Sequence, residues 1–162
     1  MSVCYIPAGN ITDDSADILV NTVNEVGVAG KGVALAFRNR WPAIMRPYKA
    51  ACASGRLRAG GCLLFPLPGP EDAILPLFGA PRQRFWAALA TKSNWRDPSR
   101  IGWIETGLAE LARLARDAGA RSVAIPPPGC GNGGLDWKTV EPLVLDALRG
   151  FDLRIYAAGN GG

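Results

Sequence analysis

The sequence contains no histidine among its 162 residues. This absence excludes histidine-ligated metal sites, Ser-His-Asp and Cys-His catalysis, and a histidine general base. The four cysteines lie far apart and include no Cys-x-x-Cys pair, so we expect neither a zinc site nor a disulfide framework. Any catalytic chemistry must therefore come from Lys, Asp, Glu, Tyr, Cys or Asn side chains, or from the substrate itself.

Long apolar runs are absent as well. No segment reaches membrane-spanning length, and the N-terminus lacks the basic-then-apolar pattern of a secretory signal, so we expect a cytoplasmic protein without membrane contact. With 48% apolar and 20% charged residues, the chain is expected to form one domain with a sizeable core. The net charge of +4 suits an anionic ligand or nucleic acid, although many ordinary domains carry a similar charge.

Short apolar segments alternate with segments of helical spacing. This order predicts an α/β layered domain with a mainly parallel sheet and helices on both faces. Asp97 is expected to cap the clearest helix, and Pro142 to lie in an early turn or to kink its helix. Segment 85–90 is read as a buried strand, but its alanines would also fit a helix, and 66–84 is read as a turn-rich excursion. The predicted strands are 3–6, 17–21, 62–65, 85–90, 122–125 and 153–156, and the predicted helices begin at 33 and span 43–53, 98–118 and 138–148.

Two glycine-rich loops follow predicted strands. One occupies 126–137 and the other 27–32. A glycine loop between a strand and a helix lets backbone N–H groups approach a phosphate, and the helix N-terminus adds partial positive charge. Neither loop has the Gly-Lys-Ser/Thr ending or the Gly-x-Gly-x-x-Gly spacing of the common nucleotide-binding loops. Both loops are also compatible with plain tight turns, but ligands of such sheets bind beyond the carboxyl ends of the strands, where both loops are expected.

Several side chains are expected at the same edge of the sheet. Lys92 ends an apolar strand, and a lysine partly sheltered from water is a candidate nucleophile or base. Asn21 and Asn24 have amides that suit ribose hydroxyls. Trp95 and Arg96 combine an aromatic ring with a cation, which suits stacking on a nucleobase. Each feature also has a plainer interpretation: a surface lysine, turn and cap asparagines, and a packed tryptophan beside a solvated helix start.

Taken together, these motifs resemble a macrodomain, and more closely the macrodomain of DNA ADP-ribosyl glycohydrolases, the DarG antitoxins that oppose the DNA-modifying toxin DarT. The resemblance covers nearly the whole chain in the right order. The Thr91-Lys92 and Trp95-Arg96 pairs resemble those of the lysine-dependent branch of macrodomains. The motifs are Gly9-Asn10-Ile11, Asn21-Thr22-Val23-Asn24, Gly27-Val28-Ala29-Gly30-Lys31-Gly32-Val33-Ala34, Thr91-Lys92-x-x-Trp95-Arg96 and Gly129-Cys130-Gly131-Asn132-Gly133-Gly134-Leu135-Asp136-Trp137.

The resemblance implies a three-layer α/β/α sandwich with a mixed central sheet over 1–157. The glycine-rich residues 158–162 are expected to form a flexible tail. It implies that Lys92 is catalytic at the anomeric carbon and that Asn24, also assigned to catalysis, faces the distal ribose. Asn10 and Ile11 are placed near the adenine, with Tyr156 close by. The ADP-ribose-binding residues implied are Asn10, Ile11, Asn21, Asn24, Gly30, Lys31, Gly32, Val33, Pro128, Gly129, Cys130, Gly131, Asn132, Gly133, Gly134, Leu135 and Tyr156.

The chain departs from the family pattern at a few positions. Asn10 stands where many macrodomains have Asp, and Asn94 where close relatives carry His. Ala88-Leu89-Ala90 replaces a more usual Asn-Phe-Pro before Thr-Lys. The excursion at 66–84 is longer than the family pattern leads us to expect.

The expected function is removal of mono-ADP-ribose from a nucleobase, thymine, in single-stranded DNA, counteracting a DarT-like toxin. Lys92 acts either as nucleophile or in proton transfer, Trp95 and Arg96 contact the DNA, and neither a metal nor a cofactor is required. The expected partners are ADP-ribose, modified single-stranded DNA and a DarT-like toxin, and the expected state is a monomer. Two alternatives remain open: a non-catalytic ADP-ribose-binding module, and a hydrolase of protein-linked or O-acyl ADP-ribose.

Overall fold

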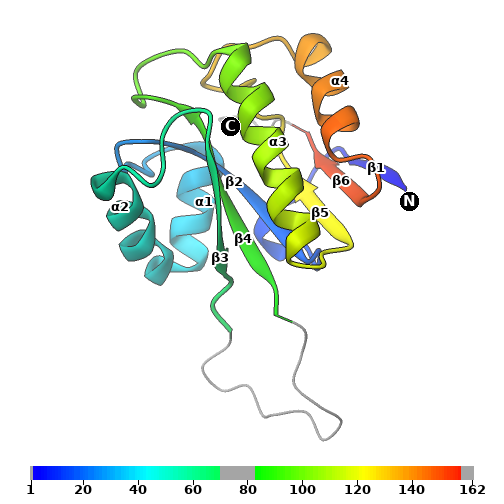
Figure 1. The fold of residues 1–162 in the computed structure, drawn as a ribbon, viewed down its shortest axis with the longest axis horizontal. Helices are drawn as coiled ribbons and strands as arrows, with labels where there is room; N and C mark the ends of the chain where they lie inside the picture. The colour runs from blue at the N-terminus through cyan, green and yellow to red at the C-terminus, as the bar shows by residue number, and fades with distance from the viewer. Residues whose placement is uncertain (1, 70–82, 158–162) are drawn as a thin grey trace, which may run out of the picture.

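The computed structural model describes residues 2–69 and 83–157. The predicted excursion falls mainly in 70–82, and the predicted tail is 158–162, so both lie outside the described residues. Along the described chain (Figure 1), the elements are β1 (Val3–Ile6), the short 3-10 helix η1 (Ile11–Asp13), β2 (Ile18–Asn24), α1 (Gly32–Arg40), the 3-10 helix η2 (Pro42–Ile44), α2 (Met45–Ser54), β3 (Cys62–Pro66), β4 (Phe85–Lys92), α3 (Ile101–Asp117), β5 (Ser122–Ile125), α4 (Trp137–Ala147) and β6 (Asp152–Tyr156).

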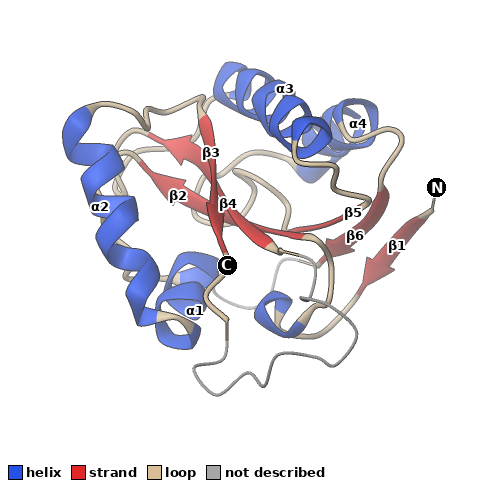
Figure 2. Cartoon of the chain, turned by 60° about the horizontal axis from the view of Figure 1, so that its bottom comes forward, coloured by secondary structure: helices blue, strands red, loops and turns tan. Residues whose placement is uncertain are grey.

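The strands form one sheet in the order β1-β6-β5-β2-β4-β3. Neighbouring strands are parallel except β3, which pairs antiparallel with β4 at one edge. Figure 2 shows α1 and α2 on one face of this sheet and α3 and α4 on the other. The three-layer α/β/α arrangement with a mixed sheet is therefore confirmed. None of the helices described in 2–69 and 83–157 is long and apolar enough to span a membrane.

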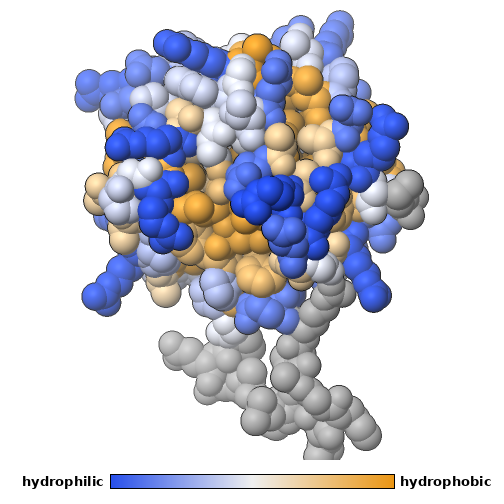
Figure 3. All heavy atoms as spheres, in the orientation of Figure 1, coloured by the Kyte–Doolittle hydropathy of each residue, from blue (hydrophilic) through white to orange (hydrophobic). Residues whose placement is uncertain are grey.

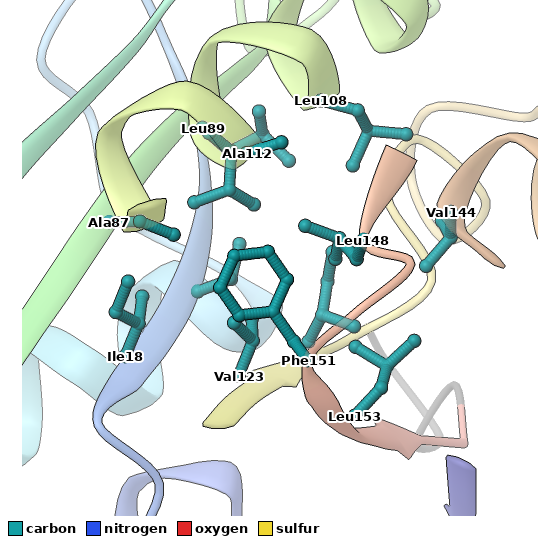
Figure 4. Close-up of a cluster of buried hydrophobic side chains, with 14 of the residues drawn as sticks. Ile18, Ala87, Leu89, Leu108, Ala112, Val123, Val144, Leu148, Phe151 and Leu153 are labelled. Carbon is teal, nitrogen blue, oxygen red and sulfur yellow. The ribbon is translucent and has the colours of Figure 1, made fainter. Parts of the chain in front are cut away.

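The central strands are buried on both faces. Successive side chains of a strand point to opposite faces, so β4 serves both helical layers. Ala87 and Leu89 pack in the cluster that contains α3 and α4, as Figure 4 shows for Leu89 near Leu108. Trp86 and Ala88 instead join the cluster under α1 and α2. The alanine-rich segment is thus a strand, and its small residues let both layers approach the sheet.

β3 is the outer strand on its side of the sheet. Its residues Leu63, Leu64 and Phe65 are half-buried. Figure 3 shows hydrophobic surface over this part of the molecule, bordered by hydrophilic side chains. The Phe65 ring stacks on Trp86 with 4.7 Å between ring centroids, which anchors the edge strand to the core.

The start of α3 differs from the sequence prediction. The helix begins at Ile101, with Arg100 at the N-cap position and no side-chain cap, so the predicted cap by Asp97 is wrong. The preceding residues are held in a turn, because Asp97 N donates to Asn94 O at 3.1 Å. Ser99 N then donates to Gly133 O at 3.0 Å, which ties this segment to the glycine loop after β5.

Most other predicted boundaries moved by one to three residues. β2 continues to Asn24, beyond the predicted end at 21, because Thr22 and Val23 keep pairing with β4. In α4, Asp136 caps the first turn by accepting from Lys138 N at 3.1 Å. Pro142 lies inside the helix in its second turn, as the early-turn prediction allowed.

Candidate active site

The site lies where β2 and β4 end side by side. These strands run parallel, and their register places Asn24 opposite Lys92, with an irregularity between Val23 and Asn24. The glycine loop after β5 and the segment from β4 to α3 both lie at the same edge, which is uppermost in Figure 1. Between these segments is a cleft of about 620 Å³, lined by Thr22, Val23, Asn24, Val28, Gly30, Lys31, Gly32, Val33, Ala34, Thr91, Lys92, Trp95, Arg96, Pro126, Pro127, Gly129, Gly131, Asn132, Gly133 and Ala157.

One wall of the cleft is the glycine loop between β5 and α4. Gly129 has a φ of 75°, a left-handed conformation that favours glycine. The loop closes on itself, because Leu135 N donates to Gly129 O at 2.9 Å and Gly134 N to Gly131 O at 3.2 Å. A Cβ on Gly133 would overlap the Gly129 carbonyl oxygen and Ser99 Oγ. Only glycine fits this position without moving the loop.

The opposite wall is the loop 27–32, which Asn24 shapes. Asn24 Oδ1 accepts from Val26 N at 3.1 Å and from Val28 N at 3.2 Å, and its Nδ2 donates to Val28 O at 2.9 Å. The hydroxyl of Tyr48 lies 2.8 Å from the Asn24 carbonyl oxygen. Asn24 is only 7% exposed, so most of its amide is committed to holding the loop. Its second Nδ2 hydrogen can serve a ligand in the cleft.

Lys92 stands between the two loops. Burial lowers the pKa of its amine, the positive charge of Lys31 lowers it further, and Asp97 opposes both effects. Its Nζ lies 3.4 Å from the backbone oxygen of Trp95. A lysine with a lowered pKa carries a larger fraction of neutral amine, which is the form that attacks a carbon or accepts a proton.

Glu25 fixes the chain around Lys92, and the sequence analysis missed it. Its carboxylate accepts from Ala59 N and from Ser93 Oγ, each at 2.7 Å. Its own backbone N donates to Lys92 O at 3.1 Å. The hydrogen bond from Ala59 is the main cause of a lowered pKa for this carboxyl group. Glu25 therefore ties the ends of β2 and β4 to the turn before β3.

Trp95 and Arg96 form the outer rim of the cleft. Trp95 is 45% exposed, and the guanidinium of Arg96 lies 4.6 Å from the centre of its ring. Both residues line the cleft, as expected for groups that meet whatever is attached to a bound ligand. The side chain of the neighbouring Asn94 makes a local hydrogen bond, because its Oδ1 accepts from Arg96 N at 3.2 Å.

Some expected binding residues do not line this cleft. Asn10 is exposed and caps η1, because its Oδ1 accepts from Thr12 N at 3.0 Å, and Ile11 beside it is buried. Asn21 is 3% exposed within β2, and its Oδ1 has no hydrogen-bond partner among the described residues. Pro128 and Gly134 belong to the glycine loop without lining the cleft.

Three further expected residues, Cys130, Leu135 and Tyr156, line a second cavity of about 600 Å³. Its other walls include Tyr5 and Trp137. Burial raises the pKa of the Cys130 thiol to about 11, so this thiol is a poor nucleophile. Tyr156 donates its hydroxyl to Asp14 Oδ2 at 2.6 Å. The two cavities share Pro127 and Ala157 as lining residues.

The cleft also has lining residues that the sequence analysis did not single out as binding residues. Thr22 and Thr91 sit at strand ends, where the alternation of side chains already indicated positions near the sheet edge. The remaining ones, except the residue after β6, belong to the motifs and glycine-rich segments noted in the sequence, but no binding role was expected for them individually. These residues are Val23, Val28, Ala34, Pro126, Pro127 and Ala157.

Comparison with known proteins confirms the resemblance noted from the motifs. The family model described as Macro domain matches residues 20–144. A protein of Mycobacterium tuberculosis (strain ATCC 25618 / H37Rv) named DNA ADP-ribosyl glycohydrolase is 38% identical over 160 residues, covering 95% of this chain and 42% of the relative. The solved macrodomain of M. tuberculosis DarG is 38% identical with a TM-score of 0.82, covering 95% of this chain and 96% of that one.

A second solved structure, Thermosipho africanus DarTG in complex with ADP-ribose, is 29% identical with a TM-score of 0.82 and covers 97% of this chain and 42% of that one. The chain thus spans about two fifths of the length of the curated relative from M. tuberculosis, 42%. The family match covers more than three quarters of the present chain. On this evidence the chain belongs to the macro domain family.

Proposed function

We propose that this protein holds ADP-ribose in the cleft between its two glycine loops and removes it from thymine in single-stranded DNA. The observation that carries the proposal is the position of Lys92, an amine of lowered pKa, between two loops suited to phosphate. Relatives of similar sequence are named DNA ADP-ribosyl glycohydrolase, which supports the same reaction. The macrodomain spans 1–157 in this proposal.

The shape of the cleft suggests how ADP-ribose lies in it. The diphosphate lies between the backbone amides of 30–33 and 129–133, where Lys31 adds positive charge. We place the adenosine against Ala34, Pro127 and Ala157, which are apolar residues of the lining. The distal ribose lies beside Asn24 and Lys92. In this arrangement, residues outside the cleft support the adenosine or the ends of the strands. These residues are Asn10, Ile11, Asn21 and Tyr156.

The bond that breaks joins C1 of the distal ribose to a nitrogen of the base. In one route the Lys92 amine attacks C1, the base leaves with the bonding electrons and takes up a proton, and water then displaces the lysine. In the other route water attacks C1 while Lys92 moves the protons. Positive charge gathers on the sugar in either transition state, so a neutral Lys92 is favoured over a protonated one. In both routes, every bond that forms or breaks belongs to the substrate, the Lys92 amine or water.

Trp95 and Arg96 are placed to meet the DNA, because they form the rim next to Lys92. We also propose that the protein acts as a monomer in the cytoplasm and opposes a DarT-like toxin. The fusion of a DNA ADP-ribosyl transferase with a glycohydrolase in a relative from Thermosipho africanus supports this pairing.

A panel of acceptors tests the proposal. The protein is incubated with ADP-ribose linked to thymidine in a single-stranded oligonucleotide, to a carboxylate of a peptide, and to an acetyl ester. Free ADP-ribose and unmodified oligonucleotide are expected from the first substrate, at a rate well above the other two. Faster release from either ester would assign the site to ester hydrolysis, and tight ADP-ribose binding without release from any substrate would leave a binding module.

A further inference from the structure

A second arginine–tryptophan pair follows the first along the segment from β4 to α3. The guanidinium of Arg96 lies 4.6 Å from the ring centre of Trp95, and that of Arg100 lies 5.0 Å from the ring centre of Trp103. A guanidinium stacked on an indole is held flat, and its outer face can stack on a nucleobase while its N–H groups bind phosphate. We call these four residues the arginine–tryptophan strip.

The strip begins beside Lys92 and continues from the rim of the cleft into the first turn of α3. Its first member touches Lys92, whose Nζ is 3.4 Å from Trp95 O. Between the two pairs, Ser99 N is bonded to Gly133 O of the glycine loop at 3.0 Å. The strip is therefore in contact with both the Lys92 amine and the glycine loop after β5.

The second pair rests on the turn before β3. A Cβ on Gly60 would lie 3.2 Å from Trp103 Cδ1, and Thr106 Oγ1 of α3 donates to Gly60 O at 2.8 Å. The neighbouring Ala59 is the residue whose N–H binds Glu25, which in turn binds Lys92 O. The second pair thus belongs to the same rigid frame as the catalytic lysine.

Positive charge prevails along this surface. Arg96 and Arg100 are exposed, and Arg58 lies close enough to Glu25 to help lower the pKa of that carboxyl group. Asp97 is the acidic residue of the turn, whereas the carboxylate of Glu25 is occupied by two hydrogen bonds. Cations interleaved with aromatic rings are the pattern by which proteins bind single-stranded nucleic acid.

We propose that the Arg100–Trp103 pair binds a nucleotide next to the modified one, so that the protein recognises a stretch of single-stranded DNA rather than an isolated ADP-ribosylated base. This inference rests on the proposed function, because it extends the substrate from the base at Lys92 to its neighbours. The modified base lies beside Trp95 and Arg96, and the adjoining strand passes over Arg100 and Trp103 at the start of α3.

The test measures binding of Arg100→Ala in a Lys92→Ala background, so that the substrate is not consumed. The probes are a ten-nucleotide single strand bearing one ADP-ribosylated thymidine and the corresponding modified mononucleotide. The oligonucleotide is expected to bind about fivefold or more weakly, and the mononucleotide equally well, because one stacked base contributes at least about that factor. The slope of log affinity against log salt is expected to fall by about 0.7 for one lost phosphate contact.

Arg40→Ala is the matched control. Arg40 stacks on Trp41 at 5.3 Å, but it ends α1, about 12 Å along the helix from the cleft residue Gly32. Unchanged oligonucleotide affinity in Arg100→Ala, an equal loss for the mononucleotide, or an equal loss in Arg40→Ala would each overturn the proposal. The measurement does not require cleavage, so a protein that binds modified DNA through the strip without releasing ADP-ribose would refute only the proposed reaction.

Discussion

Replacing Lys92 with alanine is expected to slow release of ADP-ribose from a modified thymidine oligonucleotide by about 10²- to 10⁴-fold, the usual contribution of a positioned catalytic group. Free ADP-ribose should still bind, because in the proposed arrangement the phosphate contacts come from the cleft-lining loops at 30–33 and 129–133 and not from Lys92. Single-turnover rates and calorimetric binding of ADP-ribose measure the two effects separately. Lys138→Ala, on the exposed side of α4, is the control and should leave both unchanged.

The pH dependence follows from the same residue. Burial favours the neutral amine and lowers the pKa of Lys92, so the neutral fraction appears at lower pH than for an exposed lysine. If the neutral amine attacks or accepts a proton, the wild-type rate rises with pH through this lowered pKa and then levels off. A role for the neutral amine would be contradicted if the Lys92→Ala variant kept the wild-type rate. It would also be contradicted if the wild-type rate fell as the pH rose through this range.

Gly133→Ala is expected to weaken ADP-ribose binding by about a hundredfold or more. The added Cβ overlaps the Gly129 carbonyl oxygen and Ser99 Oγ, so the loop must open. Gly129, Gly131 and Gly133 would then lose the arrangement in which they line the cleft together, and with it the proposed amide contacts to the diphosphate. Loss of two hydrogen bonds to a charged group corresponds to about 3 kcal/mol or more. Binding of ADP-ribose by calorimetry measures the change.

Gly102→Ala is the matched control for this substitution. Gly102 lies in the first turn of α3, where an added Cβ meets nothing within 4 Å. This variant should bind ADP-ribose like the wild type and unfold at the same temperature or slightly higher, since alanine favours a helix. If Gly133→Ala binds ADP-ribose normally, the glycine loop does not hold the diphosphate as proposed.

Much of the site could be predicted from the sequence because strand ends determine its position. Parallel strands deliver the residues that follow them to one edge, so Asn24 and Lys92 were expected together, and the register places them opposite each other. The layered fold followed from the alternation of strand and helix patterns. The loops near this edge could likewise be placed before their shapes were known.

The rest depended on contacts between distant segments. Glu25 acts through Ala59 and Ser93, which are 34 and 68 residues away, and no local pattern marks such a carboxylate. Cys130 and Leu135 belong to the expected loop, but the left-handed turn at Gly129 directs the chain so that both line the second cavity. The cap predicted at Asp97 is wrong because the segment before α3 is held elsewhere. Ser99 N donates to Gly133 O, and this hydrogen bond determines where the chain enters the helix.

Asn24 shows a related limit. The sequence marks it as an amide at the end of a strand, which suits a ribose hydroxyl. The structure instead directs its Oδ1 to Val26 N and Val28 N. Its contribution to the site is therefore first to shape the loop that faces the glycine loop after β5, and only its remaining hydrogen is free to meet a ligand.

The most direct test of the central claim is a crystal structure of the protein with ADP-ribose. We expect the diphosphate between the backbone amides of 30–33 and 129–133, with Lys92 Nζ within about 3.5 Å of C1 of the distal ribose, the distance of a near-attack geometry. The proposed arrangement would be contradicted by ADP-ribose bound in the second cavity, which Tyr5 and Trp137 line, or by a distal ribose turned away from Lys92.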